Sequence, residues 1–307
     1  MDPLKARLYG ALIQLPVVLL LPPLLPGLIA RVKAIVAGRR GPPLLQLYYD
    51  LAKLWQKQAV LSSTTTVMFR LGPVVAVLTA LVASMLIPMG GDAPGAFSGD
   101  LILIAYLLAL GRFFTISAAL DTGSAFEGMG ASREATFSCL AEPALFIGFA
   151  GLVRLSGQGP SLSLALAHAE PWAREAGSLL LILGAWLIVF LAENSRVPFD
   201  DPNTHLELTM VHEVMVLDHG GPPLALVLYG ASLKLLVLGA LIVRIFLPPI
   251  FGHLALGWLQ FIGGIVILMV VVGLVESLMA RLRLLHAPQL LVGANLLAVL
   301  GAGLLLR

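Results

Sequence analysis

Four charged residues lie inside, or at the end of, long apolar segments. Arg112 stands in ALGRFFT, Glu142 in FSCLAEPALFIG and Lys234 in ASLKLLVLG, and Glu193 closes a fourth apolar segment. A charged side chain within a bilayer is costly unless it is paired, hydrated or neutralised. We therefore favour a proton relay or charge-coupling element over the alternative, which is neutralised pairs that only hold helices together.

Residues 192–223 form a polar stretch between two apolar segments, with six of the 17 acidic residues and three of the six histidines. Glu193 and Arg196 are three residues apart, a spacing that lets them pair on one helical face. Pro198 then ends the helix, and a second helix is predicted over 204–217. We expect this stretch to be a structured loop with a function.

Three histidines in this stretch, His205, His212 and His219, recur every seven residues and so lie near one face of the predicted helix. Seven residues span about two turns, which is too far for the three rings to share one ion. His212 also lacks a second histidine four residues later, so the zinc-protease motif is incomplete. A solvated or partner-facing surface is therefore favoured over a metal site.

The composition is that of a membrane protein. The chain is 59% hydrophobic and 12% charged, against about 45–50% and about 25% for soluble domains. The basic residues lie beside apolar segments, so nucleic-acid binding is not indicated. Cys139 is the only cysteine, and an iron–sulfur cluster needs about four thiolates. We predict that the chain carries no redox cofactor of its own.

The apolar segments predict an all-α polytopic membrane protein with one membrane domain, 1–307, and about eight spans of roughly 20 residues each. The predicted spans are 8–30, 67–88, 100–119, 134–154, 176–193, 223–247, 254–276 and 288–306. Four prolines in the first span predict a kink there. No clear internal repeat emerges, which argues against an inverted-repeat transporter.

The connecting segments predict the orientation. Residues 31–70 carry seven basic residues and one acid, whereas residues 89–100 carry two acids and no basic residue. The positive-inside rule places the first segment in the cytoplasm and the second outside. Eight spans then put both termini outside. The polar regions predicted in the cytoplasm are 31–66, 120–133, 194–222 and 277–287.

Two of these regions have features of their own. Apolar residues at helical intervals within 43–60 predict an amphipathic interfacial helix of about 18 residues, which either anchors the chain or roofs a partner interface.

The glycines of 120–133 lack the strand–glycine–helix context of a phosphate loop. Ser132 is favoured instead as the N-cap of the fourth span.

Three motifs carry a resemblance to a known family. The acid–x–x–Arg–x–Pro–Phe–Asp pattern at 193–200 resembles the signature loop of the membrane subunit shared by respiratory complex I, where it is the H subunit, and the energy-converting membrane-bound nickel–iron hydrogenases. Glu207 matches a later glutamate of that loop, and Glu142 after Arg133 matches an acid in the fourth span. The first loop matches at Arg39, Arg40, Gly41, Pro42, Leu45, Gln46, Asp50 and Lys53.

The resemblance implies a subunit that anchors a soluble redox arm and couples electron transfer to proton or sodium translocation. The coupling residues it implies, together with the charges within the spans, are Arg112, Glu142, Glu193, Arg196, Asp200, Glu207, Glu213 and Lys234. The residues expected to face the soluble arm are Arg39, Arg40, Gln46, Asp50, Lys53, Asp121 and Arg133. The implied partners are a hydrogenase-like large subunit, a small iron–sulfur subunit and antiporter-like membrane subunits in a prokaryotic plasma membrane. The nickel–iron centre and the iron–sulfur clusters are expected in those partners.

Departures from the pattern favour one branch. Quinone-reducing members usually continue after the later glutamate with glutamate–tyrosine–serine–glycine, but residues 215–218 read Met-Val-Leu-Asp, and Glu213 is displaced from the expected register. The run HLELTMVHEVMVLDH, with Lys234 and the DTGS of the third-span loop, resembles the hydrogenase and formate hydrogenlyase branch. This weakens the case for a bound quinone. The alternatives are the quinone-site subunit of a complex I-like NADH:quinone oxidoreductase and, more remotely, a free-standing ion transporter.

Overall fold

The computed structural model describes residues 3–157, 159–166, 170–200, 210–248 and 254–305, and within them the regular structure is entirely helical. The helices are α1 (Pro3–Leu20), α2 (Leu24–Val36), α3 (Gln46–Trp55), α4 (Val67–Met85), α5 (Asp100–Asp121), α6 (Ala125–Ser156), α7 (Leu162–Ala165), α8 (Glu170–Glu193), α9 (Gly221–Phe246), α10 (Leu254–Leu278) and α11 (Ala287–Leu304), with a 3-10 turn, η1 (Val214–Val216), before α9. The expected all-α class is confirmed.

The described helices are those of a polytopic membrane protein. Seven are long and apolar enough to cross a bilayer, and α1 with α2 makes an eighth candidate if the bent pair forms one span. The bend between them is 48° and lies at Pro22 and Pro23, as the prolines of the first span predict. The carbonyls freed at the break are satisfied from outside, because the Tyr48 hydroxyl donates to Leu20 O and the Tyr229 hydroxyl to Leu19 O.

Five helices form a closed ring, in which α4, α5, α6, α8 and α9 each pack against the next and α9 packs back on α4. Outside the ring, α11 covers α6 and α8, and α10 packs between α9 and α2. Glycines let ring helices approach closely: a Cβ on Gly148 of α6 would lie 2.1 Å from Trp186 Nε1 of α8. The interior of the ring is where the buried charges meet.

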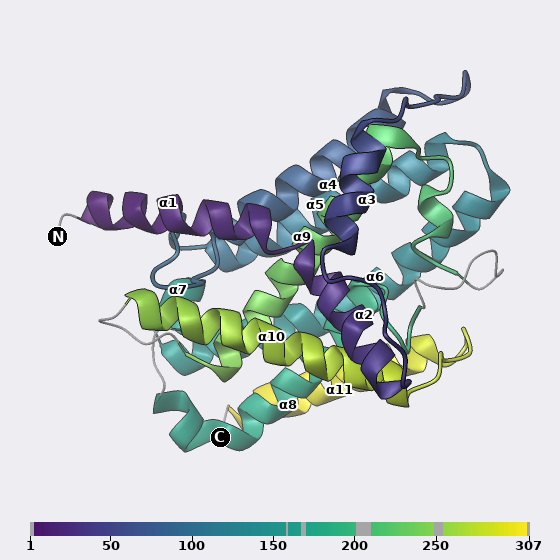
Figure 1. The fold of residues 1–307 in the computed structure, drawn as a ribbon. Coiled ribbons are helices and arrows are strands. Elements are labelled where there is room, and N and C mark those ends of the chain that lie inside the picture. The colour runs from purple at the N-terminus through teal and green to yellow at the C-terminus, as the bar shows by residue number, and fades with distance from the viewer. Residues whose placement is uncertain (1–2, 158, 167–169, 201–209, 249–253, 306–307) are drawn as a thin grey trace.

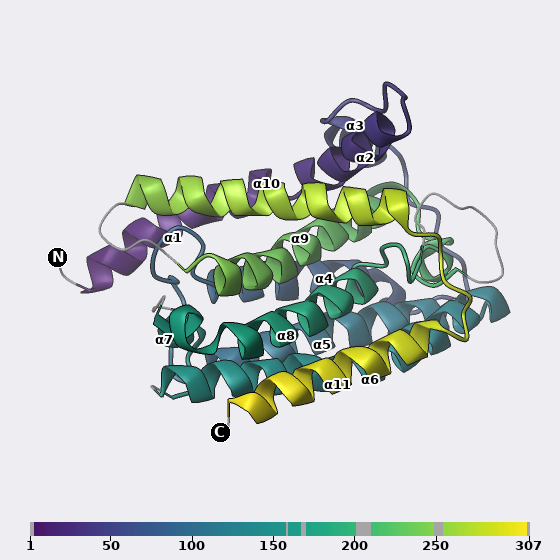
Figure 2. The same ribbon diagram turned by 90° about the horizontal axis from the view of Figure 1, so that it is seen from below.

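One end of the bundle carries the polar connections. It consists of α3 and residues 194–200, 210–220 and 279–286, and we call it the α3 end (Figures 1 and 2). Helix α1 begins and α11 ends at the opposite end of the bundle (Figure 1). Parts of three of the four connections that the sequence predicts to be cytoplasmic therefore gather at this end, and the fourth, 120–133, is joined to it because Asp218 N donates to Glu127.

Three local predictions were wrong. Helix α6 begins at Ala125 and not at Ser132, whose hydroxyl donates back to Met129 O within the helix. The reason is that residues 125–131 are good helix formers apart from two glycines, and Gly123, at φ +70°, already supplies the turn after α5. Helix α3 has 10 residues, Gln46–Trp55, instead of about 18. Pro42 and Pro43, which precede it, bear only on its start.

The third correction concerns the helix predicted over 204–217. Residues 201–209 lie outside the described part of the chain, and residues 210–217 form a turn followed by the short η1. Side chains from elsewhere hold this backbone: the N–H groups of Val211 and His212 donate to Asp200, and the Arg133 guanidinium donates to Met210 O. Apolar spacing does not reveal such contacts, because they are made across the fold.

Candidate functional site

A chain of four charged side chains lies inside the ring of helices. The Arg112 guanidinium of α5 donates to Glu142 of α6 and, at 2.8 and 2.7 Å, to both carboxylate oxygens of Glu193 of α8. Lys234 Nζ of α9 lies 2.9 Å from Glu193 Oε2. The sequence singled out all four residues, and the structure brings them together with Arg112 and Glu193 at the centre.

The four side chains differ in how deeply they are buried. The side chains of Glu193 and Arg112 are 6% and 9% exposed, whereas that of Glu142 is 40% exposed. Glu142 lies near the middle of α6, a candidate membrane span. A carboxylate that is open at this depth needs water, a partner or a proton. The row of charged side chains is therefore buried at its centre, Glu193, and accessible at one end, Glu142.

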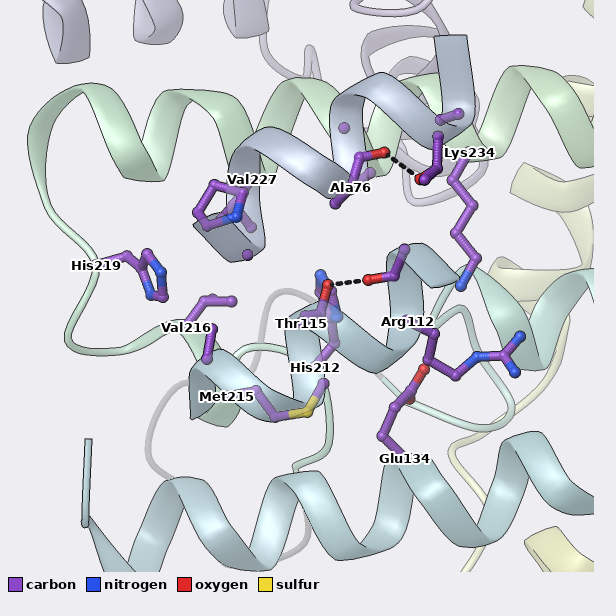
Figure 3. A pocket seen from close by; sticks show the side chains of 18 of the residues that line it. Ala76, Arg112, Thr115, Glu134, His212, Met215, Val216, His219, Val227 and Lys234 are labelled. Carbon is purple, nitrogen blue, oxygen red and sulfur yellow. Dashed lines mark hydrogen bonds between the residues drawn. The ribbon is translucent and has the colours of Figure 1, made fainter. Parts of the chain in front are cut away.

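Two cavities flank the central arginine. The first, of about 80 Å³, lies between α4, α5, α6, α9 and the 210–219 loop, and Arg112, Glu134 and Lys234 line it (Figure 3). The second, of about 240 Å³, is lined by Arg112, Glu142 and Glu193 among apolar side chains. Leu108 and Arg112 line both cavities, so these two residues of α5 lie between them.

Glu134 is a fifth buried charge near this site, and the sequence analysis missed it. It is 7% exposed and lies in the electrostatic field of Lys234, Glu193, Arg112 and Asp200. A helix start at Ser132, as the sequence predicts, places Glu134 in the first turn. With the helix beginning at Ala125, the same residue stands more than two turns inside a membrane span.

A second charge cluster lies at the α3 end. Glu276 of α10 is buried, with Lys33 Nζ of α2 at 2.8 Å and Arg196 Nη1 at 3.5 Å from its carboxylate oxygens. The expected Glu193–Arg196 pairing is thus replaced, because Glu193 is held by Arg112 and Lys234. The sequence signal for Glu276 was an acid in the apolar run ILMVVVGLVESL, which was overlooked.

Asp200 holds the loop before η1 in place. Its Oδ2 accepts from Val211 N at 3.0 Å and from His212 N at 3.2 Å, and its Oδ1 lies 3.0 Å from Arg281 Nη2. Leu282 N also donates to Pro198 O at 2.9 Å. The segment that ends at Asp200 is therefore joined both to the 210–217 loop and to the connection between α10 and α11.

We expect the Asp200→Ala variant to lose about 3 kcal/mol of stability, because it removes a buried carboxylate from an arginine and two backbone donors. Asp200→Asn should lose less, since the amide oxygen still accepts from both N–H groups while its NH₂ faces Arg281. Thermal unfolding of the purified assembly measures both, with exposed Asp92→Asn as the control. Equal melting temperatures for Asp200→Ala and Asp92→Asn would contradict this account.

The structure describes two of the three histidines of the polar stretch, His212 and His219. His205 lies outside the described residues. His212 and His219 both line the first cavity (Figure 3), and the His219 ring stacks on Phe69 with 4.0 Å between centroids. The described residues contain no cluster of three metal-binding side chains. The His219 ring is thus internal, and the expectation of a solvated or partner-facing surface was wrong for it, whereas His212 is partly exposed.

His212 is expected to make the fold sensitive to acid. Burial and the nearby Lys234 charge lower the pKa of His212 to about 4, against the opposing effect of Asp200. An unfolded histidine has a pKa of about 6.5, so stability is complete above that pH and is lost as pH falls from about 6.5 towards about 4. The drop in melting temperature between pH 7.5 and pH 5 should shrink in His212→Gln but not in the exposed-site control His286→Gln. An unchanged drop in His212→Gln would count against this assignment.

The residues expected to face the soluble arm lie at or near the α3 end, with different local roles. Arg39, Arg40 and Lys53 are exposed, and Gln46 donates to Asp50 within α3. Asp121 holds the start of α4, because its carboxylate accepts from the Thr66 and Phe69 N–H groups and the Thr66 hydroxyl. Glu213 is partly exposed beside η1. Glu207 lies outside the described residues.

Comparisons with known proteins place the chain. The family model described as NADH dehydrogenase matches residues 9–306. The chain belongs to the NADH dehydrogenase family. Among its relatives, Hydrogenase-4 component C of Escherichia coli (strain K12) is 37% identical over 239 residues, 78% of this chain and 75% of that protein. Formate hydrogenlyase subunit 4 of the same strain is 34% identical over 289 residues, 91% and 92% of the two chains.

A solved structure shares the fold of this family member. It is a chain from the membrane-bound sulfane sulfur reductase (MBS), an archaeal respiratory membrane complex, with a TM-score of 0.84, 21% identity and coverage of 98% of this chain and 99% of that chain. The family resemblance inferred from the sequence motifs is confirmed. These comparisons make the chain a relative of membrane-complex subunits.

Proposed function

We propose that this chain is the membrane subunit of a hydrogenase-type energy-converting complex, which anchors a soluble redox arm and couples electron transfer to ion translocation. The observation that carries the proposal is the chain of Glu142, Arg112, Glu193 and Lys234 inside the ring of helices. Buried, mutually paired charges between two cavities respond strongly to any change in charge at one end. That property is what coupling a redox event to an ion movement requires.

The names of the relatives support the hydrogenase branch, since the two Escherichia coli proteins are subunits named for hydrogenase-4 and formate hydrogenlyase. The departures of residues 213 and 215–218 from the pattern of quinone-reducing members also weaken the case for a quinone within this chain. We therefore propose a subunit without a redox cofactor of its own, with the nickel–iron centre and iron–sulfur clusters in its partners.

The α3 end is the proposed docking side for the soluble arm, with a hydrogenase-like large subunit and a small iron–sulfur subunit. Exposed Arg39, Arg40 and Lys53 give this side a basic surface, which the positive-inside rule assigns to the cytoplasm of a prokaryotic cell. Both termini are then outside. The open carboxylate of Glu142 lies on the face that we assign to antiporter-like membrane subunits.

Purification of the intact complex through a tag on this chain tests the proposal, with identification of the co-purifying subunits and metals. We expect a soluble arm that contains nickel and iron, and ion uptake into proteoliposomes that depends on the redox reaction. Recovery of a quinone-reducing arm without nickel would favour the alternative, a quinone-site subunit of complex I type. Ion transport by this chain alone would overturn both and favour a free-standing transporter.

A further inference from the structure

Helix α11 carries one hydrogen-bonding side chain in its membrane-spanning part. Between Leu290 and Leu304 every residue is apolar or glycine except Asn295, which stands near the middle of this 18-residue helix. Its Nδ2 group donates to Leu291 O of the same helix at 3.0 Å and to Leu140 O of α6 at 2.7 Å. Polar side chains within a span are costly and usually functional. The bond from α11 to α6 therefore needs a physical explanation.

Packing alone does not account for an asparagine at this position. Within the described residues its Oδ1 atom is buried and makes no hydrogen bond. An unsatisfied buried acceptor costs free energy, and a leucine, which has nearly the same size, would avoid that cost. Asn295 must therefore contribute through its donor group, and one of the two carbonyls that this group reaches belongs to α6.

Helix α6 needs donors from outside because it continues through Pro143. A proline has no N–H group, so the carbonyl four residues earlier, that of Cys139, has no donor within the helix, and the proline ring also crowds it. In membrane spans, side chains of neighbouring helices help to compensate such breaks. The turn 139–143 is therefore the part of α6 that its own backbone holds least, and Glu142 lies on this turn.

Side chains of two neighbouring helices hold α6 on either side of Glu142. Asn295 of α11 binds the carbonyl of Leu140, two residues before Glu142. Trp186 of α8 donates from Nε1 to Ala144 O, two residues after it, at 3.3 Å. Helix α11 packs along both α6 and α8 (Figure 2). The backbone that carries Glu142 is thus fixed from three helices.

The Glu142 carboxylate depends on this backbone for its position. Its side chain is 40% exposed, and Arg112 is the only hydrogen-bond partner it has among the described residues. Hydrogen bonds weaken steeply as their distance and angle depart from the optimum. A small displacement of the turn 139–143 would therefore separate the carboxylate from Arg112 and interrupt the chain of charges at its accessible end.

We infer that Asn295 is a positioning residue, which holds the turn of α6 before Pro143 and thereby keeps Glu142 at Arg112. The inference rests on the proposed function, because it takes Glu142 to be a working member of the chain of charges. Asn295 itself touches neither Arg112 nor a translocated ion. Helix α11 lies outside the ring and has no charged residue between Ala287 and Leu304, yet through this one amide it takes part in the function of the ring.

Asn295→Leu tests the inference, because leucine keeps the size of the side chain and lacks the donor. In proteoliposomes that hold the intact complex, redox-driven ion uptake per electron pair should fall about tenfold, since a small misplacement of a functional group has effects of this order. The amount of assembled complex should not change. Asn295→Gln, which keeps an amide donor on a longer side chain, should regain about half of the wild-type uptake.

Gln289→Leu is the matched control for this test, since it removes an exposed amide from the same helix. The control should translocate as the wild type does. Wild-type uptake in Asn295→Leu would overturn the inference. A fall in uptake that is fully explained by loss of assembled complex would also overturn it, because Asn295 would then only hold the bundle together.

Pro143→Ala separates positioning at the proline from simple attachment of α11 to α6. Alanine restores the N–H group that Cys139 O lacks, so the turn that bears Glu142 is then held by α6 itself. The drop in melting temperature that Asn295→Leu causes in the purified complex should therefore be about half as large, or smaller, in the Pro143→Ala background as in the wild type. Equal drops in the two backgrounds would make Asn295 a packing contact and overturn the inference.

The same variants distinguish this inference from the proposed function. If Glu142→Gln abolishes translocation while Asn295→Leu translocates normally, only this inference fails. If both variants translocate normally, the proposed function fails with it.

Discussion

Glu142→Gln is expected to abolish ion translocation while the complex still assembles. The change removes the titratable group at the open end of the buried chain of charges and leaves the shape of the side chain almost unaltered. Arg112 keeps its two hydrogen bonds to Glu193, so the centre of the chain stays neutralised. Glu142 is also 40% exposed in its side chain, so the neutral amide is not left fully buried. Function should therefore be lost without loss of the fold.

The measurement is redox-driven ion uptake by proteoliposomes, normalised to the amount of assembled complex on a native gel. Glu175→Gln is the matched control, because Glu175 is a carboxylate at the far end of α8, away from both cavities. The control should translocate as the wild type does. Unimpaired translocation in Glu142→Gln would remove the relay role, and a complex that fails to assemble would make Glu142 a structural partner of Arg112.

Most residues of this site can be found from the sequence, because charged residues are rare within membrane-spanning segments and are easily recognised there. Arg112, Glu142 and Lys234 are isolated charged residues within apolar segments, and Glu193 marks the end of a span. The physical rule that such charges must be compensated predicted pairs or a relay. It did not identify the partners, because each contact joins a different pair of helices and only the packing of the ring decides which helices are neighbours.

The same limit explains the parts that sequence reasoning missed. A helix start at Ser132 places Glu134 in the first turn, whereas the start at Ala125 places it inside the span. Helical spacing over 204–217 predicted a helix. For residues 210–217, hydrogen bonds from the backbone to the side chains of Arg133 and Asp200 outweigh the local helix propensity. Helix propensity is worth a few tenths of a kcal/mol per residue, whereas a hydrogen bond to a charged group is worth about 1.5–3 kcal/mol. Where such groups converge, the local pattern is overridden.

The two charge clusters connect the site to the rest of the fold. The segment 194–200 leaves α8 directly after Glu193, and Arg196 and Asp200 on it reach Glu276 and Arg281 respectively. Glu276 also holds Lys33 of α2. A displacement at the α3 end can therefore be transmitted to Glu193 through the short segment 194–200. If the proposed redox arm docks at the α3 end, this arrangement gives it a physical means of acting on the buried charges.

Arg112→Met is expected to destabilise the assembly and to abolish translocation. Arg112 is the only residue of the described chain of charges that contacts both Glu142 and Glu193, and its side chain is 9% exposed. Removing one partner of a buried ion pair costs about 3–5 kcal/mol, because the remaining charge is left uncompensated. We expect the lower end of that range, since Lys234 still holds Glu193 and Glu142 is partly exposed. Thermal unfolding in detergent measures the loss.

A second change separates stability from function. Arg112→Met combined with Glu142→Gln should regain part of the lost stability, because one of the two carboxylates that the arginine neutralised is gone, and the two effects should therefore not add. Translocation should stay absent in the double variant. Arg154→Met, at an exposed position near the end of α6, is the control for losing an arginine. If the double variant is no more stable than Arg112→Met, the arginine acts through packing and not through its charge, because only an electrostatic role is relieved by removing the opposite charge.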